Sequence, residues 1–461
     1  MKTVLSLLVL GLSSIAMASE TTVPVSAQTG MNVTIYNENR ALIKDKRQVD
    51  LTAGINELAF RGVSANMMPQ TALLKGDGIS TREQNFNFDL LTRNALLQKS
   101  VGRQVTVEYI DPATGKTHQE KAEILAFNDG HPVLKIGNKI ETDYPGRVIF
   151  DSVPENLRAQ PTLAITLVSK KAGADSLELD YLTTGLSWKA DYVAKLNADE
   201  TKMNLNGFVT LTNNSGADYK QALLQLVAGD VNVVSEYMER PRMLLAKSAN
   251  ALDMVADGME AEALTDFYIY TVPHKTDLLS NQTKQVALLS VADVGVKKTY
   301  ELNRPFSVHQ TERKNMKPDI YVSFLNTPQN GLGKPLPKGT IRMYKEDSKE
   351  NMQFIGEDRI QHIADGENVR LRLGTSFNLT ADMKRTALNK ISEKTQIASY
   401  EVVFKNGSDE NAEIELTLGF PDDFKLLDQS QKGERVTSNT IMWAVSVPAK
   451  GEARLTYKVQ Y

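Results

Sequence analysis

The chain has 461 residues, with 53 Lys and Arg against 56 Asp and Glu, and it contains no cysteine. The absence of cysteine excludes disulfide bonds and thiol chemistry, and a chain this long buries a large core without covalent cross-links. No segment is strongly basic, so the chain lacks the positive stripe that nucleic-acid binding needs, and we expect no nucleic-acid partner.

The first 18 residues have the pattern of a secretory signal peptide. Lys2 precedes a short apolar run, and Ala16-Met17-Ala18 supplies the small residues of a cleavage site. The apolar run is too short to anchor the chain in a bilayer, and no later run approaches that length. We therefore expect a periplasmic or secreted bacterial protein, cleaved after Ala18, without a transmembrane segment once the signal is removed.

Residues 30–90 form the first predicted β region. Residues 31–37, 48–51 and 55–60 alternate between apolar and polar side chains, which is typical of strands with one buried face. Residues 89–100 have the clearest helical pattern of the chain, with Asp89 as the expected N-cap and Gly102 after the end. This helix is expected to mark a domain boundary.

Residues 97–153 change in character and predict a small inserted β module. Five short apolar runs are separated by turn sequences such as Asn128-Asp129-Gly130 and Pro145-Gly146. About fifty residues with five strands is the size of a small barrel. A structural role is the preferred interpretation, because the basic and aromatic residues are scattered, and a binding role is the alternative.

Residues 160–234 predict the first part of a β-sandwich. Two strand patterns at residues 177–181 and 188–193 are joined through Gly185 and predict a hairpin. The turn Asn213-Asn214-Ser215-Gly216 predicts a second hairpin between residues 203–211 and 221–228. A sheet with one apolar face needs a second sheet to cover it.

Residues 235–266 interrupt the strand pattern with a segment rich in Met and Ala. A flexible excursion is one interpretation, and a methionine-rich face that docks a partner, with Met254 and Met259 as contact candidates, is the other. Residues 267–461 then return to alternating strands. In the last of these, residues 453, 455, 457, 459 and 461 are expected to face the core.

The predicted fold is therefore all-β. It consists of antiparallel β-sandwich domains with an inserted small five-stranded, barrel-like module and one short helix.

Two aromatic side chains are candidates for ligand contact. Trp188 and Tyr192 lie four residues apart in a predicted strand and share a face, where they could stack on a sugar ring. The preferred interpretation is that both are core anchors between two sheets, because large aromatic residues dominate sandwich cores. Trp443, in the middle of another strand pattern, has the same two interpretations.

The sequence contains no recognisable catalytic, cofactor or metal motif. The five histidines are far apart and lack metal-ligand spacing, and no nucleophile elbow or complete phosphate-binding loop is present. Glu357 and Asp358 are adjacent carboxylates of the kind a glycosidase needs, but a surface turn is the preferred interpretation.

Several segments in one order resemble a known family. They are DYLTTGLSWKADY, DFYIYTVPHKTDLLSNQTKQVALL, LGKPLPKGTIRMYKED, FIGEDRI and the closing YEVVFKNGS and YKVQY. Over about residues 177–461 the chain resembles the bacterial domain of unknown function 4139 (DUF4139), and it is distantly similar to mucoidy-inhibitor-type proteins. Those relatives carry a coiled coil where this chain has the small β module. The resemblance implies an exported β-rich protein and supplies no activity, cofactor or catalytic residue.

Three functional hypotheses follow. The favoured one is a noncatalytic exported protein that binds an envelope component or another protein through an exposed patch. The second is a hydrolase of envelope polysaccharide or peptide, which requires acids or a histidine to converge in a cleft. The third is a self-associating structural subunit that uses free sheet edges.

Overall fold

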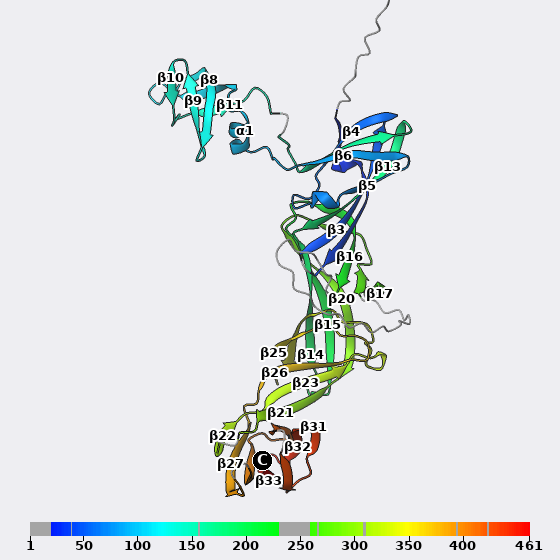
Figure 1. The fold of residues 1–461 in the computed structure, drawn as a ribbon, viewed down its shortest axis with the longest axis vertical. Helices are drawn as coiled ribbons and strands as arrows, with labels where there is room; N and C mark the ends of the chain where they lie inside the picture. The colour runs from blue at the N-terminus through cyan, green and yellow to red at the C-terminus, as the bar shows by residue number, and fades with distance from the viewer. Residues whose placement is uncertain are drawn as a thin grey trace, which may run out of the picture. The chain divides into compact units, whose positions relative to one another are not determined.

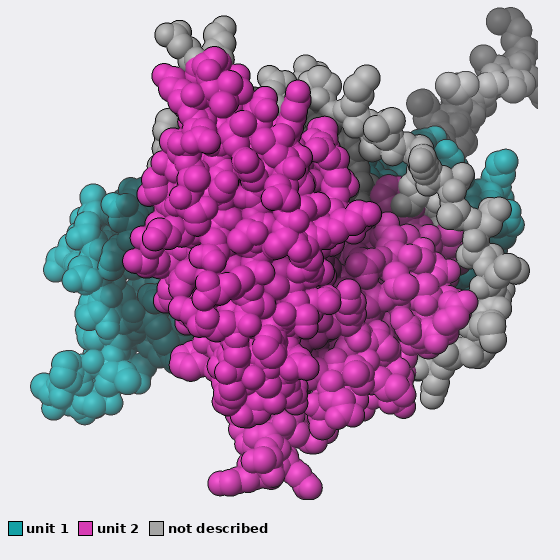
Figure 2. Space-filling model, turned by 90° about the horizontal axis from the view of Figure 1, so that it is seen from below, with its two compact units in different colours: residues 1–187, 212–225, 274–283 teal, residues 188–211, 226–273, 284–461 magenta. Residues whose placement is uncertain are grey.

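The computed structural model describes residues 20–37, 39–154, 157–229, 259–264, 267–307, 310–392, 395–421 and 424–461. The chain divides into two compact units, coloured separately in Figure 2. Unit 1 contains residues 1–187, 212–225 and 274–283, and unit 2 contains residues 188–211, 226–273 and 284–461. The expected signal peptide and Met254 lie outside the described residues.

Strands dominate both units, which confirms the all-β prediction (Figure 1). Most of the neighbouring strands whose pairing is described run antiparallel, and the parallel pairs among them include β1 with β4, β14 with β24, and β21 with β29. The described part of the chain contains three 3-10 turns, at Val25–Ala27, Pro69–Thr71 and Pro328–Asn330. None of the helices in the described ranges has the length and apolar character needed to cross a bilayer.

Apart from the small module, unit 1 is built on two sheets. The first has the order β1-β4-β12-β6, and the second contains β16-β2-β3-β13-β5, with β19 paired to β16. Their bounds are β1 Thr21–Val23, β2 Gln28–Tyr36, β3 Arg40–Leu51, β4 Gly54–Arg61, β5 Leu73–Lys75, β6 Ile79–Asn87, β12 Thr162–Ser169, β13 Gly173–Thr184, β16 Tyr219–Ala228 and β19 Thr276–Leu278.

A buried ion pair joins these two sheets. Alternate residues of β3 are buried, and this inward face carries Asp45 and Arg47, both 1% exposed. The Arg47 guanidinium donates to the Asp45 carboxylate at 2.7 and 3.0 Å. It also donates to the backbone oxygens of Val23 in β1 and Arg61 in β4, both at 2.8 Å. The Arg47 side chain of the second sheet therefore donates hydrogen bonds to backbone carbonyls on two strands of the first sheet.

The small module forms a single sheet from five strands, as the sequence predicts. Its order is β10-β9-β8-β7-β11, so β10 and β11 are opposite edges. The described strands form an open sheet, so the barrel-like module is not a closed barrel. The strands are β7 Gln104–Ile110, β8 Thr117–Asn128, β9 His131–Ile136, β10 Lys139–Glu141 and β11 Arg147–Ile149.

The helix α1, Arg93–Lys99, is shorter than the predicted residues 89–100. Thr92 rather than Asp89 is the N-cap, since its hydroxyl accepts the N–H of Ala95 at 3.1 Å. Asp89 instead forms an ion pair with Lys99 at 2.7 Å. The chain before Thr92 is held extended by a bridge between Leu90 and Arg158, so the helix begins later than its polar residues suggest.

The two predicted hairpins of residues 177–228 are wrong. β13 pairs with β3 and β5, whereas β14 (Leu186–Leu196) lies between β15 (Lys202–Asn213) and β24 in another sheet. β15 in turn lies between β14 and β20, and β16 pairs elsewhere. At Gly185 the backbone has φ +89, and a Cβ would meet the backbone of Asn214 at 2.7 Å. Glycine is therefore needed where the chain leaves one sheet for the next.

In unit 2, one sheet has the order β20-β15-β14-β24-β25. β17 pairs with β18, so residues 260–264, which the sequence places in the flexible segment, form a strand. Residues 235–258, 265 and 266 of that segment lie outside the described residues. The bounds are β17 Glu260–Leu264, β18 Phe267–Thr271, β20 Gln282–Gly295, β24 Gly339–Glu346 and β25 Met352–Ile360.

The last part of unit 2 is a sandwich of two sheets. Their orders are β26-β23-β21-β29-β32-β31 and β22-β27-β28-β33-β30. The bounds are β21 Lys297–Pro305, β22 Glu312–Met316, β23 Asp319–Leu325, β26 Asn368–Thr375, β27 Leu379–Lys390, β28 Gln396–Asn406, β29 Ala412–Gly419, β30 Lys425–Gln429, β31 Glu434–Thr437, β32 Thr440–Val447 and β33 Glu452–Gln460.

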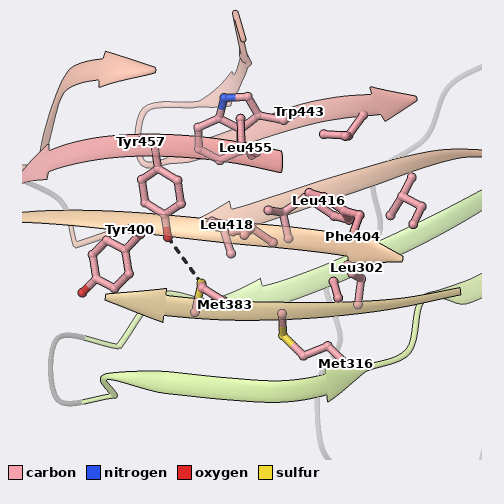
Figure 3. Close-up of a cluster of buried hydrophobic side chains, with 14 of the residues drawn as sticks. Leu302, Met316, Met383, Tyr400, Phe404, Leu416, Leu418, Trp443, Leu455 and Tyr457 are labelled. Carbon is pink, nitrogen blue, oxygen red and sulfur yellow. Dashed lines mark hydrogen bonds between the residues drawn. The ribbon is translucent and has the colours of Figure 1, made fainter. Parts of the chain in front are cut away.

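Side chains from both sheets fill the core of this sandwich (Figure 3). Trp443 is fully buried, and its indole N–H donates to Gln429 at 2.9 Å. Tyr457 stacks on Trp443 and donates its hydroxyl to the Met383 sulfur at 3.4 Å. Alternate residues of β33 are buried, as the sequence predicts. Trp443 is therefore a core anchor.

We expect the variant Asp45→Asn to destabilise unit 1 by about 3–5 kcal/mol, because it leaves the buried Arg47 charge without a counter-charge. Asp50→Asn is the matched control, since Asp50 lies on the exposed face of the same strand. Urea unfolding and hydrogen exchange of peptides covering β3 measure the difference. Equal stability of the two variants would show that the buried pair is not needed.

Candidate functional site

A half-open hollow of about 620 Å³ lies in the small module between α1 and β11. Leu91, Leu96 and Leu97 line it from the helical side. Leu97 is 1% exposed and belongs to the core of the module, so it fixes the helix against the sheet. Leu91 is 42% exposed and forms an open part of the wall.

The opposite wall is the β11 segment. Arg147, Val148 and Phe150 line the hollow together with Gly146. A Cβ at Gly146 would collide with the backbone oxygen of Glu108, so only glycine allows the chain to approach β7 this closely. β11 pairs with β7 on one side and ends the sheet on the other. The wall is therefore an edge strand.

Two arginines line this apolar hollow, of which Arg147 is paired with the carboxylate of Glu108. The Arg147 Nε donates to Glu108 at 2.7 Å, and Gln119 donates to the other oxygen of the same carboxylate at 2.5 Å. The Gln119 hydrogen bond, followed by those of Arg147, lowers the pKa of Glu108. The Arg147 side chain remains 74% exposed although it is anchored. Arg93 is exposed, and no ion pair is found for it among the described residues.

This arrangement has the features of sites that bind extended peptides. A strand edge beside a helix offers unpaired backbone groups to an added strand and apolar walls to its side chains. Guanidinium groups recognise carboxylates through paired hydrogen bonds. Apolar walls, an edge strand and two arginines therefore suit a segment with apolar side chains and at least one carboxylate. We call this site the α1–β11 groove.

The sequence-predicted contact residues lie elsewhere, in unit 2. Trp188 and Tyr192 are 5% and 0% exposed, and both are satisfied by backbone oxygens. The Trp188 indole donates to Val227 at 3.3 Å, and the Tyr192 hydroxyl donates to Pro337 at 2.8 Å. Both rings are core anchors and present no face to a sugar. Met259 is also buried, at 3% exposure.

The paired carboxylates do not form a catalytic centre. Glu357 and Asp358 lie in the strand β25, not in a turn, and so point to opposite faces of the sheet. Glu357 pairs with Arg342 at 3.1 Å, while Asp358 accepts the N–H of Arg372 at 2.8 Å. Each carboxylate thus has its own structural partner.

A buried hydroxyl cluster in unit 1 is also structural. Ser64 is fully buried, and its hydroxyl contacts that of Thr183 at 2.6 Å and donates to the backbone oxygen of Ser215 at 2.9 Å. These partners are hydroxyls and carbonyls, which are not strong enough bases to activate a serine. Within the described ranges, no three His, Asp or Glu side chains converge as a metal site.

The sequence predicts parts of the α1–β11 groove but not the groove itself. These parts are the helix near residue 93 and the turn Pro145-Gly146. Their proximity depends on β11 returning beside β7, the first strand of the module, which no local pattern indicates.

We expect acid to weaken the module through Glu108. The pKa of this carboxyl is lowered in the folded state, so its contribution to stability is complete above its ordinary pKa, about 4.5. That contribution is lost as the pH falls through the lowered value. Hydrogen exchange of β7 and β11 peptides, corrected for intrinsic rates, should show acid loosening that Glu108→Gln removes. Glu141→Gln, on the exposed strand β10, should retain it; identical acid profiles for both variants would refute this role.

Comparison with known proteins shows where the chain belongs. No curated protein matches the sequence significantly. The model of a family described as a domain of unknown function (DUF4139) matches residues 177–461, more than half of the chain. This segment begins in β13, and the α1–β11 groove lies before it. On the strength of this match, the chain is a member of the DUF4139 family.

Proposed function

We propose that the protein is an exported, noncatalytic binding protein of the periplasm or cell exterior, and that its small module binds an extended peptide segment of an envelope protein. The observation that carries this proposal is the hollow between α1 and the edge strand β11. The signal-like pattern of residues 1–18 supports export.

The proposed binding mode is strand addition to β11. β11 supplies the backbone groups of Arg147–Ile149, and its partner β7 already occupies the inner side. An incoming segment pairs on the outer side, and its alternate side chains turn toward α1. Leu91 and Leu96 then contact its apolar side chains.

The two arginines give this site its selectivity. Arg147 is held by Glu108, so little side-chain freedom is lost when it receives a ligand. Arg93 lies on the first turn of the helix and faces the same hollow. A carboxylate on the incoming segment is therefore favoured, and a basic segment is repelled.

Display of a random peptide library tests the proposal, with affinities measured by fluorescence polarisation. We expect enriched peptides to alternate apolar residues and to carry an acid. Arg93→Glu and Leu91→Glu should each weaken binding at least about tenfold. Lys139→Glu, on the opposite edge strand β10, is the matched control and should leave affinity unchanged. The proposal would be overturned if no peptide were enriched. It would also be overturned if the enriched peptides bound both groove variants as tightly as the wild type.

Export has its own test. When the full-length gene is expressed in a bacterium, we expect the protein in the extracytoplasmic fraction to begin at Ser19, as intact mass spectrometry would show. Recovery of an unprocessed chain beginning at Met1 from the cytoplasm alone would contradict export while leaving the groove hypothesis open to its own measurement.

A further inference from the structure

The strand β6 is a long and exposed edge of the four-stranded sheet in unit 1. It spans nine residues, Ile79–Asn87, and within the described part of the chain it pairs along its length with β12 alone. The four consecutive residues 80–83 are exposed. An edge of this length offers unpaired N–H and C=O groups to another strand.

The faces of β6 follow from its pairing with β12. Phe86, Gln84 and Thr81 oppose Leu163, Ile165 and Leu167, which are the buried apolar residues of β12. These three side chains therefore lie on the core face. Ser80, Glu83 and Asn85 lie on the solvent face. Arg82 is an extra residue at a β-bulge, between Thr81 and Glu83.

We propose that β6 is a self-association edge, to which β6 of a second copy of this chain adds in antiparallel orientation. In the proposed register a two-fold axis passes between residues 82 and 83, so the residue numbers of each opposed pair add to 165. Each core-face residue of one copy then lies opposite a core-face residue of the other copy, because the bulge at Arg82 occurs at the same position in both β6 strands. The pairs are Ile79 with Phe86, Ser80 with Asn85, Thr81 with Gln84, and Arg82 with Glu83 of the second copy.

Charge selects this register over its neighbours. Arg82 and Glu83 are exposed and have no ion pair among the residues described, which leaves both charges without a counter-charge, although the Glu83 carboxylate accepts one hydrogen bond from the Asn85 amide at 2.8 Å. In the proposed register each Arg82 faces a Glu83, twice across the two-fold axis. A shift of one residue either way places Arg82 opposite Arg82 or Glu83 opposite Glu83, which is unfavourable. The same shift moves core-face side chains opposite solvent-face side chains.

Apolar contact adds to the charge match. Phe86 stacks on Phe88 with ring centroids 5.7 Å apart, and Phe88 is 68% exposed. Ile79 is half-buried at the other end of the strand. The antiparallel register brings Ile79 of one copy opposite Phe86 of the other, so both ends of the joined strands gain an aromatic and aliphatic pair.

Charge-reversal variants of the mature chain test this register by sedimentation equilibrium over a concentration series. Arg82→Glu alone opposes Glu to Glu, and Glu83→Arg alone opposes Arg to Arg, so each should weaken dimerisation about tenfold. An equimolar mixture of the two variants restores both opposite-charge pairs and should dimerise as the wild type does. The double variant R82E/E83R should also dimerise.

Controls separate this edge from the groove and from misfolding. Circular dichroism should be unchanged in all variants, since both side chains are exposed. Arg93→Glu should leave the dimer intact. A wild-type chain that stays monomeric throughout the series overturns the proposal. So does a dimer that neither single variant weakens, or a mixture that fails to restore it.

Discussion

Every strand at the end of a sheet has unpaired backbone groups along one side, and the treatment of these edges shapes what this protein can bind. Most edges in unit 1 are short: β1, β5, β10 and β11 each have three residues. A short edge offers too few hydrogen bonds to recruit a strand unaided. β11 gains additional contacts from the adjacent helix, and β6 gains them from its length. The two proposed surfaces are thus different solutions to one constraint.

The interior of the fold could be predicted from the sequence, because burial follows side-chain alternation. The pattern of β33 and the burial of Trp443 both follow from local periodicity. The pairing of strands could not be predicted. Gly185 and the segment of residues 213–216 carry turn signals, yet each lies where the chain changes sheet rather than in a hairpin. Asn213 and Ser215 instead fill a buried polar cluster, in which Asn213 accepts the N–H and hydroxyl of Ser215. A turn sequence indicates that the chain bends, whereas tertiary contacts determine which sheet the next strand joins.

The candidate site, like the strand pairing, could be predicted only in part from local sequence patterns. The helix near residue 93 and the last strand of the module are visible in the sequence as separate patterns, but their approach is set by the order of five strands. The aromatic residues chosen from the sequence, Trp188 and Tyr192, fill the core as their preferred interpretation implied. Side-chain type alone does not distinguish a stacking platform from a core anchor. The decisive signal is where the neighbouring sheet lies, which is a long-range property.

The extent of the family match adds a last step. The matched segment begins at Leu177, within β13, and both neighbours of β13 in its sheet, β3 and β5, precede that residue. The matched segment therefore includes a strand that cannot be left unpaired without exposing a new edge. The C-terminal sandwich, by contrast, has its described core residues within 300–461, inside the matched segment. A relative with a different N-terminal region must still supply partners for β13, whereas nothing in the matched segment requires β6 or the module. The proposed groove and self-association edge thus lie outside the matched segment, whereas the sandwich lies within it.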